Sequence, residues 1–154
     1  MFDLSLFDNE RKKVEAVNKV MVCNNISSRY GMILKQEDVL RIIETQELSL
    51  VEQERIEFGG TIIEQLIYAF CDSQFISKYE YAESMIKFVE IFYHYREELD
   101  EFLSDEEIIE YMQRSFNGPC QGSMDWLESS QLWILMKAID ERKDIYMDDD
   151  YGCF

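Results

Sequence analysis

Turn-forming residues and long apolar runs are scarce in this chain of 154 residues, and each scarcity excludes a class of protein. One proline and six glycines argue against collagen-like repeats, general disorder and a turn-dense all-β fold. No apolar run approaches the roughly 18 residues that a membrane-spanning helix needs. The N-terminus, Met1 to Leu4, has neither the basic region nor the apolar stretch of a signal peptide. We therefore expect a cytoplasmic protein.

Cysteine is present, but the four residues are not arranged in any metal or redox motif. Cys23, Cys71, Cys120 and Cys153 lie far apart, which excludes a CxxC pair and a zinc knuckle. Without an export signal, free thiols are expected instead of disulfides. Cys23 and Cys71 have apolar neighbours, so we expect both in the core.

Basic residues are outnumbered two to one. The chain has 32 acidic and 15 basic residues, which gives a formal net charge of −17. Such a charge repels nucleic acids and anionic membranes, so neither is expected as a direct partner. It favours a basic protein, or a protein that ordinarily binds polyanions, as the partner. The plainest alternative is that the charge only maintains solubility.

The length and the apolar content predict one domain with a full core. Apolar residues make up 47% of the chain, and a chain of this size can bury most of its apolar surface. No internal repeat or linker is present, and apolar residues recur at helical spacing. We predict an irregular all-α bundle of about six helices over residues 1–147, followed by an acidic tail at 148–154.

The spacing of apolar residues places the individual helices. The predicted ranges are about 9–24, from 36 onward, 62–71, 78–102, 105–116 and 124–142, with a separate short helix within 48–56. A Ser or Thr followed three residues later by Glu marks four helix starts, at Ser49/Glu52, Thr61/Glu64, Ser77/Glu80 and Ser104/Glu107, and Ser123 can cap the last helix. The range 62–71 is apolar almost all round, so we expect it in the centre of the fold.

The single histidine, His94, falls on the longest predicted helix. Its apolar face is centred on Val89, and His94 lies on the opposite, acidic face. Five glutamates on this face form a candidate interaction surface: Glu83, Glu90, Glu97, Glu98 and Glu101. The plainest interpretation is a solvated histidine that offsets its acidic neighbours.

A metal site is the alternative interpretation of the same face. Glu90 and Glu98 lie four residues before and after His94, within reach of its ring, and a second helix could add carboxylates. However, the chain has no second histidine and lacks the Glu-x-x-His pattern of di-iron bundles. We therefore predict no metal or cofactor, and keep a metal-assisted enzyme using His94 as an alternative.

Cys120 is the candidate reactive thiol. It lies in the turn-rich stretch Gly118 to Ser123, just before a predicted helix, and the dipole of a helix N-terminus lowers the pKa of a thiol. The acidic surroundings act in the opposite direction. A glycine-rich loop whose cysteine packs inward is the plainer interpretation.

Several stretches together resemble an uncharacterised family of small acidic bacterial proteins, a domain of unknown function. The matching pieces are Tyr30-Gly31, Ile56-Glu57-Phe58-Gly59, Tyr68-Ala69-Phe70-Cys71-Asp72-Ser73, Tyr81-Ala82-Glu83, Glu90-Ile91-Phe92-Tyr93, Leu103-Ser104-Asp105-Glu106-Glu107 and Cys120-Gln121-Gly122-Ser123. The chain departs from the family at Lys35, where the family often has threonine. The resemblance implies no reaction and no catalytic residue.

No catalytic constellation emerges from these residues, and no substrate or oligomeric state follows from them. We therefore predict a non-enzymatic, acidic helical module that binds a protein partner. The alternatives are the metal-assisted enzyme and a polyanion mimic, whose carboxylates would take the place of DNA phosphates.

Overall fold

The regular structure is helical throughout the part of the chain that the computed structural model describes. These residues are 4–53, 61–99 and 101–150, with side chains described for 10–53, 61–99 and 101–142. The elements are α1 (Leu4–Val22), α2 (Asn24–Ser27), the 3₁₀ turn η1 (Ser28–Tyr30), α3 (Gln36–Glu52), α4 (Thr61–Phe70), α5 (Tyr81–Leu99), α6 (Asp105–Asn117), α7 (Met124–Trp126), the π-helical turn η2 (Leu127–Gln131) and α8 (Leu132–Asp150). The predicted all-α fold is confirmed.

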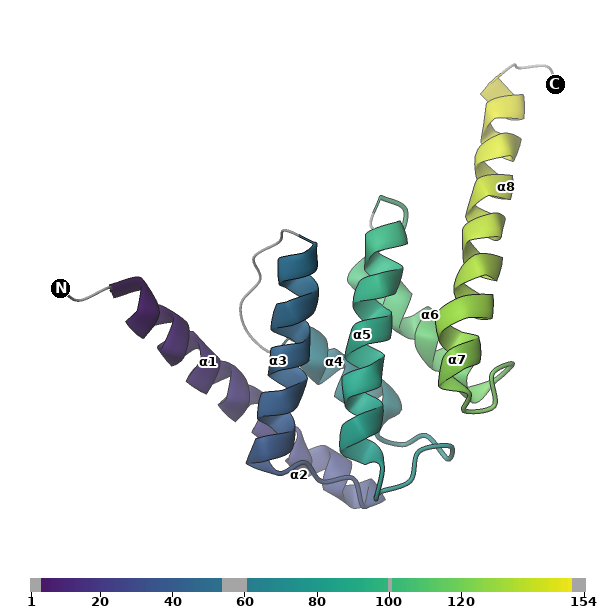
Figure 1. The fold of residues 1–154 in the computed structure, drawn as a ribbon. Coiled ribbons are helices and arrows are strands. Elements are labelled where there is room, and N and C mark those ends of the chain that lie inside the picture. The colour runs from purple at the N-terminus through teal and green to yellow at the C-terminus, as the bar shows by residue number, and fades with distance from the viewer. Residues whose placement is uncertain (1–3, 54–60, 100, 151–154) are drawn as a thin grey trace.

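Helix α5 is the central element of the bundle (Figure 1). It packs along α3 on one side and contacts α4, α6, η2 and α8 on its others. Helices α3 and α5 lie side by side and run in the same direction, with their C-terminal ends at the same end of the molecule. Helices α1 and α8 project from opposite sides of this body. Helix α5 therefore packs on more than one of its faces.

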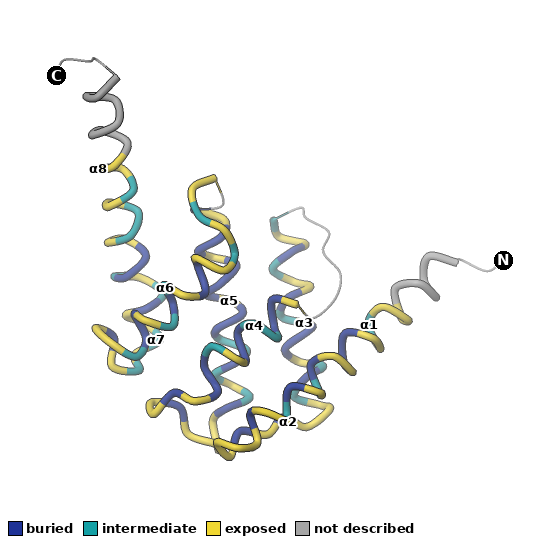
Figure 2. The backbone as a smooth tube through the Cα atoms, turned by 180° about the vertical axis from the view of Figure 1, so that it is seen from behind, coloured by how far each residue is buried: buried dark blue, intermediate teal, exposed yellow. Residues whose placement is uncertain are grey.

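Helix α4 is buried as its sequence predicts. It contacts α1, α2, α5 and α6, and it lies behind α3 and α5 in Figure 1, so that Figure 2 shows it in front of them. Its buried side chains are Ile62, Ile63, Leu66, Ile67 and Phe70. Burying an aliphatic or aromatic side chain of this size contributes about 1.5–3 kcal/mol.

An aromatic cluster joins α4, α5 and α6. The rings of Phe70 and Phe88 stack with centroids 3.8 Å apart. Phe116 meets both rings edge to face, at 5.6 Å from Phe70 and 5.0 Å from Phe88. The two edge-to-face contacts suit the quadrupole of an aromatic ring, whereas the stacked pair is closer than the quadrupole favours. The cluster therefore fixes the relative positions of three helices at one point.

Two of the helix caps predicted from the sequence are present in the structure. At the start of α6, the Ser104 hydroxyl accepts from the Glu107 N–H at 3.2 Å, and the Ser104 N–H donates to the Glu107 carboxylate at 3.1 Å. At the start of α7, the Ser123 hydroxyl accepts from the Trp126 N–H at 3.2 Å. Helix α4 begins at Thr61, so this residue is the first of the helix and not the cap before it, one position earlier than predicted.

Two other predicted caps are wrong. Ser49 lies inside α3, where its hydroxyl donates to the Thr45 carbonyl at 3.0 Å. Ser77 precedes a turn, and α5 begins only at Tyr81. The separate short helix within 48–56 is also wrong as far as Glu52, because α3 continues unbroken to that residue; the rest of that stretch lies outside the described residues.

At the start of α3, the residue at the cap position does not cap the helix with its own side chain, and a carboxylate three residues later bonds to its backbone instead. Lys35 occupies the cap position, and its backbone N–H donates to the Asp38 carboxylate at 2.9 Å. This is the half of a capping box that does not need a hydroxyl at the first position. The helix therefore starts at Gln36 despite the lysine.

The last predicted helix is interrupted by the π-helical turn η2, which the sequence did not indicate. The buried Tyr95 hydroxyl of α5 donates to the Leu127 carbonyl at the start of this turn. The Tyr111 hydroxyl of α6 donates to the Gln131 carbonyl at its end, at 2.8 Å. Two tyrosines from the body thus hold both ends of the irregular turn. Helix α8 then continues through Asp150, so the predicted domain boundary at residue 147 stays a prediction.

One charged side chain is enclosed in the core. Arg96 of α5 is only 4% exposed, and its guanidinium lies 3.7 Å from the Asp105 carboxylate at the start of α6. The guanidinium carbon also lies 5.0 Å from the centre of the Tyr93 ring and 5.7 Å from that of Phe92. Ion pairing and cation–π contact offset the cost of burying this charge.

The loop between α6 and α7 packs tightly against Phe75. Gly122 has a φ of +84°, and a Cβ atom there would lie 2.6 Å from the Phe75 Cβ. Gly31 has a similar φ of +80°, but its nearest atom would be the Lys78 Cδ at 3.9 Å. The two glycines therefore share a backbone conformation and differ in the space around them.

Two alanine substitutions are expected to separate the effect of the backbone conformation from the effect of the surrounding space: Gly31→Ala and Gly122→Ala. Alanine at Gly31 should lower the free energy of unfolding by about 1–2 kcal/mol, because only the left-handed conformation is penalised. Alanine at Gly122 should cost about 1–3 kcal/mol more, because Phe75 must also move. Urea denaturation of both variants measures the difference; equal losses would contradict the packing described here.

Tyr95→Phe and Tyr81→Phe form a second matched pair. The Tyr81 hydroxyl is buried and has no hydrogen-bond partner of good geometry among the described residues. Tyr95→Phe should lower the free energy of unfolding by about 1–3 kcal/mol, because a buried carbonyl loses its donor. Tyr81→Phe should change it by less than about 1 kcal/mol. Chemical denaturation distinguishes them, and a larger loss at Tyr81 would refute the assignment.

Candidate functional site

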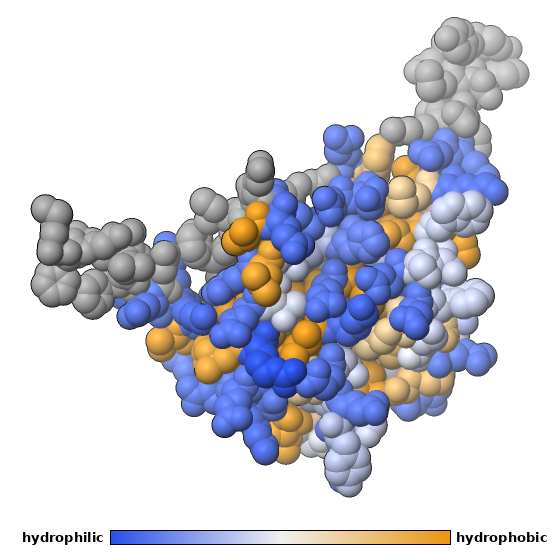
Figure 3. Space-filling view, in the orientation of Figure 1, coloured by the Kyte–Doolittle hydropathy of each residue, from blue (hydrophilic) through white to orange (hydrophobic). Residues whose placement is uncertain are grey.

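A groove of about 420 Å³ lies between the C-terminal halves of α3 and α5. Helix α3 contributes Leu48, Glu52 and Gln53, and α5 contributes Glu90, His94 and Glu97. All three glutamates and His94 are exposed to solvent. Figure 3 shows hydrophilic surface over this region, with apolar surface over the upper part of α3. The groove is thus an open, acidic site.

The base of the groove is held in place by Tyr93. Its ring is buried, and its hydroxyl accepts a hydrogen bond from the Gln46 amide at 2.9 Å. The Gln53 amide nitrogen donates to the Tyr93 backbone carbonyl at 2.8 Å. The Gln53 side-chain oxygen is buried and has no hydrogen-bond partner among the described residues. The two helices are therefore tied together beneath the groove, and one acceptor there is unused.

The direction of α3 and α5 adds to the negative potential. Both helices present their C-terminal ends at the groove, and a helix C-terminus carries a partial negative charge. The last turn of α3 contains no basic residue that would offset it. The basic residue in the last turn of α5 is Arg96, which is buried next to Asp105. The carboxylates and the two helix ends thus act in the same direction.

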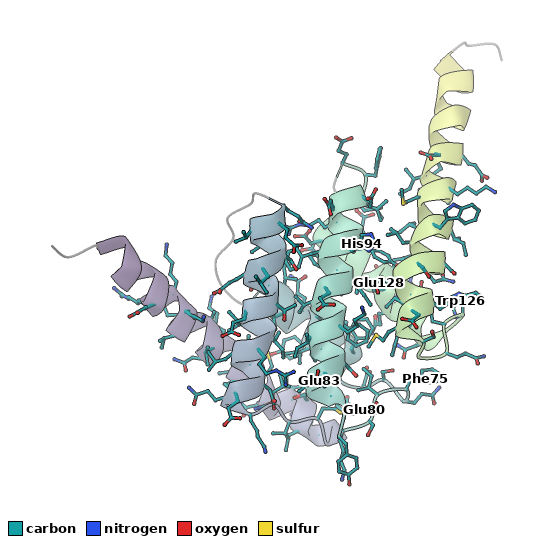
Figure 4. The ribbon with its side chains drawn as sticks, viewed as in Figure 1. Phe75, Glu80, Glu83, His94, Trp126 and Glu128 are labelled. Carbon is teal, nitrogen blue, oxygen red and sulfur yellow. The ribbon has the colours of Figure 1, made fainter. Side chains whose placement is uncertain are left out.

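The predicted acidic face of α5 is divided among different environments. Glu90 and Glu97 line the groove with His94. Glu83 lies near the opposite end of α5, where its carboxylate pairs with Arg41 of α3 at 2.6 Å (Figure 4). Glu98 and Glu101 are exposed and do not line the groove. The structure therefore brings together two of the five predicted glutamates, with Glu52 as a third.

The described side chains contain no metal-binding cluster. Within residues 10–53, 61–99 and 101–142, no three His, Cys, Asp or Glu side chains converge in a way that could hold a metal ion. His94 is exposed, and Glu98 lies outside the groove that Glu90 and His94 share. The geometry of Glu90, His94 and Glu98 thus gives the metal-assisted alternative no support.

The surroundings of Cys120 disfavour the thiolate form that a reactive cysteine needs. Its side chain is buried, and burial raises the pKa of the Cys120 thiol above its ordinary value. Burial also raises the pKa of Cys23 and of Cys71, which lie in the core as predicted. A raised pKa lowers the thiolate fraction at neutral pH. The helix that follows Cys120, α7, is a single turn. The plainer interpretation, a cysteine packed inward, fits these observations.

The contribution of α3 was missed because the sequence was divided in the wrong place. A separate helix within 48–56 would have removed Glu52 and Gln53 from the helix beside α5. The signal that could have prevented this is the unbroken spacing of Val39, Ile43, Gln46 and Leu50, which are buried along one face of α3. A continuous stripe of this kind predicts one helix through residue 52.

Other surface features are less suited to a specific polar ligand. A smaller groove of about 290 Å³ between α1 and α3 is lined mainly by Val14, Val17 and Leu40. At the base of α8, Trp126 is half exposed, whereas Glu128 points to the body (Figure 4), where it pairs with Lys87 at 2.9 Å. Within the described ranges, no helix is both long enough and apolar enough to cross a bilayer.

These observations define a single-domain, all-α protein with an acidic groove between two parallel helices. Residues 19–144 match the family of unknown function DUF6323, and the chain belongs to that family. The resemblance to a domain of unknown function is therefore confirmed. No curated protein and no solved structure matches the chain.

The buried thiols give a direct test of the environment of Cys120. In a Cys153→Ser background, which leaves only the three described thiols, reaction with Ellman's reagent at neutral pH should be slower in the folded protein than in urea by at least about tenfold. Cys120→Ser supplies the control by removing one thiol from the total. A fast phase in the folded protein that disappears in Cys120→Ser would restore the reactive-thiol hypothesis.

Proposed function

We propose that this protein is a non-enzymatic interaction module whose groove between α3 and α5 binds a cationic segment of a protein partner. The observation that carries the proposal is that Glu52, Glu90 and Glu97 line one groove at the C-terminal ends of two parallel helices. Carboxylates and helix C-termini both attract positive charge, and no described lysine or arginine lines this groove.

The chemistry of the groove favours binding over turnover. Hydrolysis or transfer would need a nucleophile or a base directed at an acceptor, together with donors for a developing negative charge. The groove supplies carboxylates, which repel such a charge, a single imidazole, and the hydroxyls of Thr45 and Ser49, which donate to backbone carbonyls of α3. It suits the ammonium group of lysine or the guanidinium group of arginine, both of which pair with carboxylates.

The net charge of −17 supports the same partner class. Long-range attraction raises the rate of encounter with a basic protein, and salt weakens it. A partner that ordinarily binds polyanions would also be attracted, and DNA would then compete for it. We expect such a partner in the cytoplasm, which is the location predicted for this protein.

Neutralising the groove is expected to weaken binding of a cationic probe. A labelled oligoarginine peptide should bind the triple variant Glu52→Gln, Glu90→Gln, Glu97→Gln about tenfold more weakly than the unchanged protein at low salt, because three ion pairs are lost. Fluorescence anisotropy at low and high salt measures the affinity.

A matched control removes the same amount of charge elsewhere. Glu106→Gln, Asp140→Asn and Glu141→Gln change three exposed acids of α6 and α8 and should alter the affinity by less than about twofold. Equal losses in the two triple variants would mean that the net charge alone attracts the peptide, and the groove would then not be the binding site.

A further inference from the structure

The groove between α3 and α5 has an apolar rim as well as acidic walls. Leu48 and Val51 of α3 are 66% and 72% exposed, and Leu48 lines the groove. They lie three residues apart, so both face the same side of α3. Single exposed apolar residues are ordinary, but two on one face next to a groove form a contact surface.

We propose, on the basis of the function proposed above, that the occupant of this groove is a basic amphipathic helix of a partner protein. Its apolar stripe would pack on Leu48 and Val51, and its lysines and arginines would pair with Glu52, Glu90 and Glu97. Helices that lie in grooves are recognised by apolar anchors at helical spacing together with flanking charges.

The dimensions of the site suit a short helix. The groove extends along α3 from Thr45 to Gln53, which corresponds to about 12 Å at 1.5 Å per residue. Leu48 and Val51 lie within this stretch, and Glu90 and Glu97 are two turns apart on α5. About two to three turns of a bound helix would therefore contact the apolar rim and the acidic wall together.

Charge complementarity selects this occupant over a second copy of the chain. Two copies that met through this groove would bring together Glu52, Glu90 and Glu97 of each, with −17 on each chain. Such like charges oppose association. A helix with a basic flank instead neutralises the groove while it covers the apolar rim.

Two synthetic peptides of identical composition test the proposal. Both contain only leucine, lysine and alanine; one places leucines at helical spacing along one face, and the other has the same residues in scrambled order. The patterned peptide should bind at least about tenfold more tightly, because only its helix presents leucines and lysines together. Titration calorimetry at moderate salt measures both affinities.

Variants of the rim identify the contact. The double variant Leu48→Ser, Val51→Ser should bind the patterned peptide about tenfold more weakly and should bind the scrambled peptide with unchanged affinity. Val22→Ser with Ile33→Ser, which changes two exposed apolar residues of α1 and the loop before α3, should leave both affinities unchanged. Circular dichroism of the free proteins confirms that both double variants remain folded.

The outcomes separate this inference from the function on which it rests. If both peptides bind equally, and both lose affinity when Glu52, Glu90 and Glu97 are neutralised, the groove binds cations but not an amphipathic helix. If neither peptide responds to the groove variants, both proposals fail. If sedimentation shows a dimer that Leu48→Ser with Val51→Ser dissociates, a second copy covers the rim and the inference is overturned.

Discussion

Burial of helix α5 on most of its circumference is the constraint on which the rest of the fold depends. Its side chains pack against α3, α4, α6 and the π-helical turn, and ten of them are buried. The exposed side chains of α5 are Glu83, Glu90, His94, Glu97 and Glu98, which lie along one strip of the helix. Because α5 cannot move without disturbing every neighbour, the groove that it forms with α3 has a wall whose backbone is held in place before a partner binds.

The sequence predicted what depends on periodicity, and it missed what depends on contacts between distant segments. The apolar faces of α4 and α5 and the cap at Ser104 are local patterns, and the structure confirms them. The false caps at Ser49 and Ser77 show the limit of a four-residue motif. A hydroxyl inside a helix can bond the carbonyl one turn earlier, as Ser49 does with Thr45, and the motif then marks no helix start.

The site itself was half predictable for the same reason. The projection of α5 placed His94, Glu90 and Glu97 on one polar strip, because they share a helix. Which helix would lie beside that strip, and in which direction, is a property of tertiary packing that one helix does not encode. Arg96 illustrates the same point: its partner Asp105 belongs to α6, so only the packing of α6 against α5 brings the two charges together.

The charge of the molecule is also less uniform than its composition suggests. Arg41 pairs with Glu83, Lys87 with Glu128 and Arg114 with Glu110, so several exposed acids are already partly neutralised by neighbours. The acids of the groove have one such neighbour, Lys87, which lies 3.6 Å from Glu90. The electrostatic potential at the surface therefore depends on where the basic residues lie as well as on the number of acidic residues.

The π-helical turn has a consequence for the geometry of α8. Such a turn is equivalent to one extra residue inserted into a regular helix, and each residue of an α-helix turns the following side chains by about 100°. The wide π turn absorbs this extra residue, so the side chains beyond it keep the direction that they would have without it. If Leu127–Gln131 were instead a regular α-helix of the same length, every side chain beyond it, Trp133 and Ile134 included, would be rotated by about 100°. The direction of the side chains on the projecting helix thus depends on the wide turn, whose two ends Tyr95 and Tyr111 hold.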